Sequence, residues 1–285
     1  MADYLQRVQS PLNVDQWRAL DQMVVQTAQA ILVGRRFLTL TGPFGLGVEA
    51  LPTDTLSGTT TAQVDLLGNA TGEAVGVERR RFVPLPLIYK DFWILGRDLE
   101  ANRQFGLPLD ASKAAAAAAA CAQAEDQLIF DGNPALDLTS VRNAQGRQTN
   151  PLGDWGQVGQ GFADVVEGSR LLTESGFPGP YALIVSPRLY AQLNRIFGNT
   201  GVLEIEQVQK LARRGVYPTS VLPEPSALLI DSGPQNMDLA VSLDLSTAFV
   251  ESTDLNYHFR VLESLALRIQ RPHAICTFEP AGGGE

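Results

Sequence analysis

The sequence is poor in the residue types on which many enzymes and extracellular proteins depend. It holds two cysteines and two histidines in 285 residues. Cys121 and Cys276 lie far apart, so we expect two buried thiols, with a disulfide between them as the alternative. The patterns C-x-x-C, H-E-x-x-H and E-x-x-H are missing, which removes the usual signals of a zinc or di-iron centre. His258 and His273 are therefore expected to be structural.

Long apolar runs and clustered positive charge are also missing. No segment approaches the roughly 20 apolar residues that span a bilayer, and residues 1–22 lack the apolar stretch of a secretory signal. We expect a cytoplasmic protein without a membrane partner. The net charge of -9 and the isoelectric point near 4.8 argue against a nucleic-acid partner, because phosphate binding depends on clustered Lys and Arg. The basic cluster at 78–81 is predicted to be a solvated strand edge.

The sequence contains no catalytic or nucleotide-binding motif in the structural context that such a motif requires. The stretch Gly45–Ala50 fits G-x-G-x-x-A, but Pro52 and Gly58 follow where a dinucleotide site requires a helix. No G-x-S-x-G elbow is present. Glu125 and Asp126 are adjacent on a predicted helix and point away from one another, so we expect pairing with arginine and not a shared acid–base site. We predict no catalytic residue, no metal site and no cofactor.

Alanine, in contrast, is abundant in one place. The segment from Asp110 to Gly132 contains seven consecutive alanines, and residues 114–124 carry no charge. Alanine is the strongest helix former, and a helix without charge on any side is typical of a buried position. We predict a spine helix of about twenty residues that Asp110 or Ser112 caps and Gly132 ends. A drifted low-complexity surface helix is the alternative, although it should carry more Glu and Lys.

The rest of the chain alternates helix and strand signals, which predicts a mixed α/β fold. An N-terminal helix that ends near Gly34 is indicated by apolar residues at helical spacing: Trp17, Leu20, Val24, Ala28 and Ile31. A strand is expected from Phe37 to Thr41. Residues 48–86 are rich in Thr, Gly and Val and predict a long two-stranded excursion. An isolated hairpin is marginally stable in water, so this segment needs a partner surface.

Six segments, taken together and in order, resemble the family 1 encapsulin shell proteins, formerly called linocin-type bacteriocins. They lie between Leu5 and Phe278 and read PLNVDQWRALDQ, VGRRFLTLTGPFG, EDQLIFDG, GPYALIVSPRLY, LEIEQV and LRIQRPHAICTF. The resemblance implies a Hong Kong 97-type phage major capsid fold with a peripheral domain, an axial domain and an extended loop. The implied segments are 1–47 (N-terminal helix, start of the peripheral domain), 48–88 (extended loop), 89–160 (peripheral domain with the spine), 161–240 (axial domain) and 241–285 (closing strands and a flexible tail).

The resemblance also implies a function. Identical subunits would assemble into an icosahedral shell of sixty copies times a triangulation number, enclosing cargo enzymes that carry a C-terminal targeting peptide. LIYKDFWILGRDLE and PLGDW look like members that form larger shells around ferritin-like iron-storing cargo, with a dye-decolourising peroxidase as the alternative cargo. The expected role is iron storage or defence against oxidative stress. Two readings from other classes stay open: a prophage major capsid protein that packages DNA, and a soluble enzyme.

Two sites follow from the same resemblance. A cargo-binding face would comprise Leu20, Val24, Ala28, Ile31, Arg35, Phe37, Thr39, Leu243 and Leu245. The helical part of this set fits an ordinary core face equally well, because a groove floor and a core face share one apolar pattern. A pore loop that lines the fivefold opening would comprise Gly198, Asn199, Thr200 and Gly201.

Overall fold

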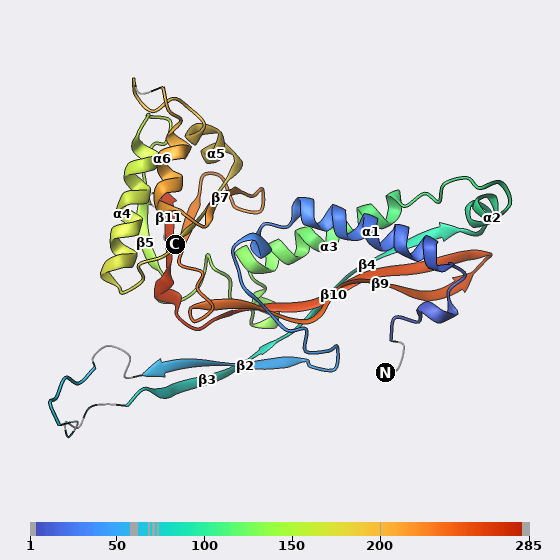
Figure 1. Cartoon of the computed structure of the whole chain (residues 1–285), viewed down its shortest axis with the longest axis horizontal. Coiled ribbons are helices and arrows are strands. Elements are labelled where there is room, and N and C mark those ends of the chain that lie inside the picture. The colour runs from blue at the N-terminus through green and yellow to red at the C-terminus, as the bar shows by residue number, and fades with distance from the viewer. Residues whose placement is uncertain are drawn as a thin grey trace.

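The computed structural model describes residues 4–57, 62–67, 69, 72, 74–199 and 201–280. Two α/β units and a separate hairpin make up this part of the chain (Figure 1). None of the helices in these ranges has the length and apolar character needed to cross a membrane. The flexible tail expected at the C-terminus falls mainly on 281–285, outside the described residues, while Glu279 and Pro280 belong to the last strand.

The first unit is a four-stranded sheet with two long helices on one face (Figure 1). Its strands, in spatial order, are β1 (Leu40–Thr41), β9 (Met237–Thr253), β10 (Asn256–Ile269) and β4 (Leu87–Leu95). β1 runs parallel to β9, and the other pairs are antiparallel. The covering helices are α1 (Val14–Ile31) and α3 (Ser112–Phe130). The short helices of this unit are η1 (Arg7–Gln9), η2 (Gly34–Arg36), α2 (Gly96–Phe105) and η3 (Pro134–Leu136).

The predicted spine helix is confirmed as α3. The predicted cap is wrong, because the N-cap position is Ala111, which makes no side-chain cap. Asp110, one residue earlier, accepts a hydrogen bond from the Ser112 backbone N–H at 2.9 Å, and Gly132 adopts φ +74° just beyond the helix end. Ala114 and Ala118 are fully buried, as is Cys121 one turn further on. Their small side chains allow α1 and the sheet to pack closely against α3. Cys121 and Cys276 are both buried free thiols, as expected.

The second unit contains a five-stranded sheet with three helices. Its strands, in spatial order, are β5 (Gln148–Leu152), β11 (Ile275–Pro280), β8 (Ala227–Ile230), β6 (Ala182–Val185) and β7 (Gly215–Pro218). Its helices are α4 (Gln160–Glu174), α5 (Pro187–Leu193) and α6 (Glu204–Leu211), and η4 (Pro272–Ala274) precedes β11.

The sheet of the second unit extends beyond the segment 161–240. β5 and β11 lie outside that segment and pair side by side at one end of the sheet. β5 was not predicted from the sequence. Its sequence is polar and includes Pro151, which an edge strand tolerates because one side of it makes no ladder hydrogen bonds.

The hairpin of β2 (Ala50–Ser57) and β3 (Gly76–Pro84) projects from the body as a two-stranded sheet (Figure 1). Its base is held by a small apolar cluster in which Val83 and Leu85 contact residues of the first unit. Further out the apolar side chains are uncovered, and Val64 and Leu66 are 99% and 98% exposed. The basic cluster at 78–81 lies on this solvated strand, as predicted, with Arg80 paired to Asp54 at 2.7 Å.

Candidate functional site

Helix α1 begins with a reciprocal capping arrangement. The Asn13 side chain accepts from the Gln16 backbone N–H at 2.9 Å, and the Gln16 side chain accepts from the Asn13 N–H at 2.8 Å. These bonds satisfy donors that the first turn of a helix otherwise leaves free. Leu20, Val24 and Ala28 then form the buried stripe of the helix. The opposite flank of α1 stays at the surface.

The segment after α1 differs from the expected strand at Phe37–Thr41. Gly34–Arg36 forms the 3-10 turn η2, and only Leu40 and Thr41 pair with β9. The buried Asp126 carboxylate holds this turn, because it accepts the backbone N–H groups of Val33 and Gly34 at 2.9 Å each. A carboxylate at this position satisfies two buried backbone donors that follow the end of α1. Arg35 therefore lies on a turn and not on a strand.

Strand β9 carries a bulge opposite this turn. Ser246 pairs with Leu262 and Leu243 pairs with Ser264, so Asp244 and Leu245 lie opposite the single residue Glu263. The Asp244 carboxylate accepts from the Leu245 N–H at 2.8 Å, and its backbone carbonyl accepts from the Ser246 hydroxyl at 2.8 Å. A bulge bends its strand and redirects the side chains at that point.

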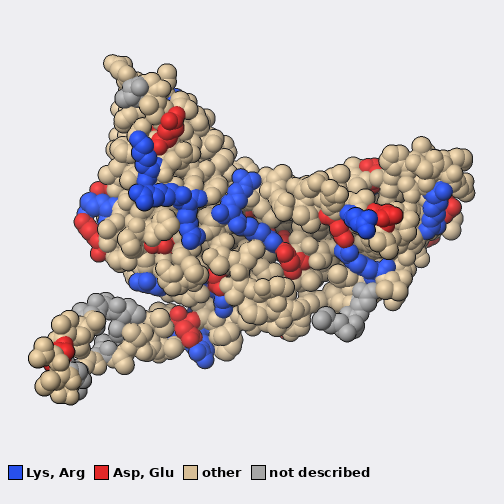
Figure 2. Space-filling view, in the orientation of Figure 1, with Lys and Arg blue, Asp and Glu red and all other residues tan. Residues whose placement is uncertain are grey.

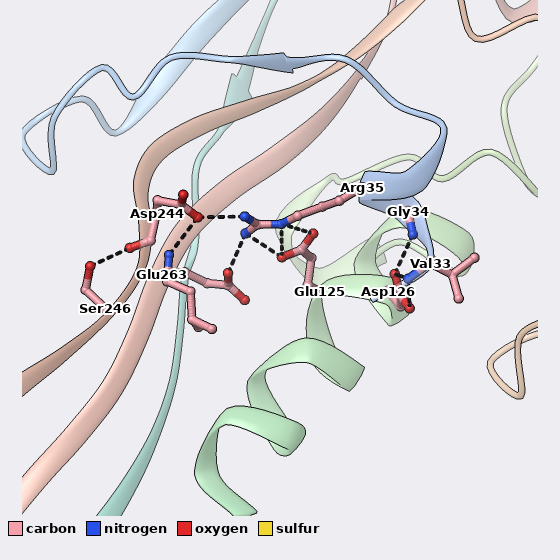
Figure 3. Close-up of polar contacts among 9 residues, drawn as sticks. Val33, Gly34, Arg35, Glu125, Asp126, Asp244, Ser246 and Glu263 are labelled. Carbon is pink, nitrogen blue, oxygen red and sulfur yellow. Dashed lines mark hydrogen bonds and ion pairs between the residues drawn. The ribbon is translucent and has the colours of Figure 1, made fainter. Parts of the chain in front are cut away.

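Arg35 joins the turn, the spine helix and the bulge through three carboxylates (Figure 3). Its Nε donates to both Glu125 oxygens, at 2.8 and 3.0 Å, and its Nη2 donates to Glu125 at 2.8 Å. Nη2 also donates to Glu263 at 2.9 Å, and Nη1 donates to Asp244 at 2.6 Å. The predicted pairing of Glu125 with an arginine is thus confirmed.

Burial shifts the acid–base properties of this cluster. It raises the pKa of Glu263, and the adjacent charge of Glu125 raises it further, while Arg35 acts in the opposite direction. Burial alone would lower the pKa of Arg35, but hydrogen bonds and ionic contact with Glu125 outweigh it and the pKa is raised. Burial also raises the pKa of Asp126 to about 6, against the effect of its backbone N–H donors.

A groove of about 400 Å³ lies beside the cluster, between α1 and the bulge. We call it the α1–β9 groove. Its lining residues are Val25, Ala28, Gln29, Leu32, Arg35, Arg36, Leu40, Asp244 and Leu245. A second hollow of about 710 Å³ continues along the same flank of α1 toward Trp17 and shares Val25 with it. The two hollows together follow one helical face, because residues three and four apart lie in line.

The predicted cargo-binding residues divide between this groove and the interior. Ala28, Arg35 and Leu245 line the groove. Leu20, Val24 and Phe37 do not: they are buried within the subunit, and Phe37 packs against the rings of Phe130 and Tyr217. Ile31 and Leu243 are half-buried and Thr39 is exposed, outside the groove lining.

Three of the groove residues absent from the prediction share a pattern that is visible in the sequence. Val25, Gln29 and Leu32 lie one position along from the predicted stripe and form a second, partly apolar line on α1. Asp244 gave no such signal, because its place in the groove depends on the bulge.

The predicted pore loop lies between α5 and α6 at one end of the second unit. Ile196 and Leu203 form a β-bridge that closes the loop, and Gly198 and Gly201 adopt φ +55° and +73°. Positive φ favours glycine, which accounts for this residue type at both positions. Asn199 is exposed, and Thr200 lies outside the described residues.

Comparison with known proteins identifies the chain's relatives. The family described as encapsulating protein for peroxidase matches residues 2–266. The type 1 encapsulin shell protein EncA of Myxococcus xanthus is 47% identical over 285 residues, which is 100% of this chain and 99% of that protein. The chain belongs to this encapsulin shell family. A diheme-cytochrome-encapsulin shell fusion protein of Kuenenia stuttgartiensis is 41% identical, over 94% of this encapsulin chain and 74% of the fusion protein.

More distant similarities agree with the encapsulin assignment. A ferritin-like-encapsulin shell fusion protein of Pyrococcus furiosus is 23% identical over 73% of this chain and 56% of that one. The crystal structure of the virus-like particle from Pyrococcus furiosus matches with a TM-score of 0.77 at 20% identity, covering 93% of this chain and all of that one. The capsid of Myoviridae phage XM1 matches with a TM-score of 0.63 at 13% identity, over 86% and 90%. The phage capsid fold is thereby confirmed, and the chain is a self-assembling encapsulin shell subunit.

Proposed function

We propose that copies of this chain close into an icosahedral shell of sixty subunits times a triangulation number, and that the α1–β9 groove binds the C-terminal targeting peptide of an enclosed enzyme. The groove carries this proposal. It combines apolar walls from Val25, Leu32 and Leu245 with charged groups at one end, which suits a short peptide held by a few apolar anchors.

The cargo we propose is an iron or peroxide enzyme, either ferritin-like or a dye-decolourising peroxidase. The family description names a peroxidase, and two relatives are fusions with a ferritin-like protein and a diheme cytochrome. The role would be iron storage or defence against oxidative stress. The loop of Gly198, Asn199, Thr200 and Gly201 would line the opening through which ions pass, with the segment 161–240 forming most of the axial domain.

Protein cargo is favoured over packaged DNA by the charge of the chain. Its net charge is -9, and Figure 2 shows that Lys and Arg on this face gather in separate groups, several of them beside Asp or Glu. DNA binding draws most of its affinity from clustered positive charge.

The test is co-purification of cargo from cells that express the chain together with its neighbouring genes. Leu245→Asp should assemble but lose the cargo, because the carboxylate would lie unpaired against an apolar peptide side chain. Val166→Asp, at an exposed position on α4, is the matched control and should keep the cargo. Mass spectrometry and electron microscopy of purified shells give both readouts. Full loading of Leu245→Asp shells would place the docking site elsewhere.

A further inference from the structure

The Arg35 cluster has one cation for three carboxylates. Glu125 and Glu263 are at most 1% exposed, whereas the Asp244 side chain is 60% exposed. With all three carboxylates ionised, the cluster would carry a net charge of -2. Water can solvate the charge on Asp244, but Arg35 alone would have to compensate both buried carboxylates, Glu125 and Glu263. Uncompensated buried charge is among the most unfavourable arrangements in a protein interior, and the usual outcome is that one group takes up a proton.

The hydrogen bonds show which carboxyl is least suited to be an anion. Glu125 accepts three contacts from Arg35, and Asp244 accepts from Arg35 and from the Leu245 N–H. Glu263 accepts a single hydrogen bond, from Arg35, and its Oε1 is buried without a hydrogen-bond partner in the described part of the chain.

The other groups around Glu263 leave it as the proton carrier. Burial raises the pKa of Glu263, and the neighbouring carboxylates Glu125 and Asp244 both raise it further. Cys121 of α3 faces it, and burial raises the pKa of that thiol to about 12, so the thiol is neutral. Of the two charged residues on β4, Lys90 lowers the pKa of Cys121 and Asp91 raises it.

We propose that Glu263 is protonated at neutral pH and that this proton holds the β9 bulge, and with it the Leu245 wall of the α1–β9 groove, in place. Glu263 is a positioning residue: it touches Arg35 and not the groove. When it releases the proton to solvent, Arg35 faces three anions. Asp244, the most exposed of them, is the one that water can solvate best, so it leaves Arg35. Leu245 moves with it, because its N–H is bonded to the Asp244 carboxylate. The effect on cargo rests on the proposed function of the groove, but the movement of the wall does not.

The movement can be followed with a polarity-sensitive thiol dye on Val25→Cys in assembled shells, since both native cysteines are buried. Titration from about pH 7 to about pH 10.5 should show a single-proton change in dye emission, because burial and the charge of Glu125 raise the pKa of Glu263 to about 9. Glu263→Gln keeps the shape of the neutral acid and should abolish the change. Glu251→Gln, the same substitution at an exposed position on β9, should show the same change in dye emission as the wild type.

Infrared spectroscopy of unlabelled shells gives a second readout. The wild type should show the C=O stretch of a protonated carboxyl at neutral pH, and Glu263→Gln shells should lack it. If Glu263→Gln shells do not form, Glu125→Gln serves instead: it removes the neighbouring anion and should move the transition down by at least about one pH unit. No transition in the wild type, or the same transition in Glu263→Gln shells, would overturn the proposal.

Neither readout involves cargo, so a groove that binds no peptide would leave both results unchanged. Cargo is examined separately. Shells loaded with the co-purifying cargo should release it several-fold faster at about pH 10 than at about pH 7.5, and Glu263→Gln shells should show no such difference.

Discussion

The spine helix and the extended hairpin place their apolar side chains in opposite surroundings. Along α3, Ala114 and Ala118 are completely buried by other parts of the same chain. Along the hairpin, Val64 and Leu66 are almost completely exposed. The subunit therefore supplies a core for its body but not for its hairpin. Burial of apolar surface is the main stabilising contribution in folding and in association. The body is therefore stabilised by its own chain, and we expect the hairpin to be stabilised by neighbouring subunits.

Deleting Thr55–Val77, which removes most of the hairpin, should have the largest effect of the changes considered, because it should prevent assembly without unfolding the body. The truncated subunit should fold, because the base cluster around Val83 and Leu85 is kept, but it should not close into shells. Negative-stain microscopy and light scattering should find small soluble species, while circular dichroism should match the wild type. Closed shells of normal size would show that the hairpin is dispensable for assembly.

Removing the cation at the centre of the body should come next. Arg35→Met leaves Glu125 and Glu263 buried without a partner, which is expected to lower the free energy of unfolding by about 3–5 kcal/mol. The loss should be smaller in acid, where the carboxyls can take up protons. Denaturant unfolding at two pH values measures both effects, and Arg35→Met combined with Glu125→Gln should recover part of the loss. An unchanged midpoint for Arg35→Met would mean that the cluster adds nothing to stability.

Asp126 offers a smaller effect with a defined pH window. Burial raises its pKa from 3.8 to about 6, so its favourable contribution is complete below about pH 4 and is lost as the pH rises through about 6. Asp126→Asn has no proton to lose. The wild type should therefore lose up to about 3 kcal/mol relative to Asp126→Asn over this range. Unfolding midpoints of the two proteins at about pH 4 and pH 7.5 give the comparison, and a constant difference between them would contradict the assignment.

The smallest structural effect is expected at the loop between α5 and α6. Asn199→Lys adds a positive charge to an exposed turn, so assembly should be unchanged while cation entry into loaded shells slows. Asn199→Gln is the neutral control. Stopped-flow uptake of a metal ion by the enclosed cargo measures the rate. Equal uptake rates for the two variants would show that this loop does not line the path by which ions enter.

The sequence was informative wherever local signals determine the structure. Alanine propensity predicted α3, helical spacing predicted α1, and Thr- and Val-rich alternation predicted the hairpin. It failed where a distant residue decides. The turn at Gly34 is held by Asp126, 92 residues away, and no local pattern at Phe37 reports that carboxylate. Similarly, the bulge that turns Leu245 toward the groove exists only in register with β10.

One part of the groove could be predicted from the sequence only incompletely. The second apolar line on α1, with Val25 and Leu32, could be read from the sequence, but the deeper stripe with Leu20 and Val24 carries the stronger signal. Both lines have helical spacing, and only the position of α3 decides which of them becomes core. That position is set by packing across the whole unit, which one sequence window does not contain.

The narrow attachment of the hairpin has a geometrical consequence. A closed shell with more than sixty subunits must place chemically identical chains in surroundings that are not identical. Strand β2 has eight residues, so its outer end lies about 26 Å from its base. A rotation of about 10° at the small cluster of Val83 and Leu85 would displace that end by about 5 Å while leaving both α/β units intact. One sequence can in this way meet neighbours at several angles, with the difference in curvature taken up at the base of the hairpin.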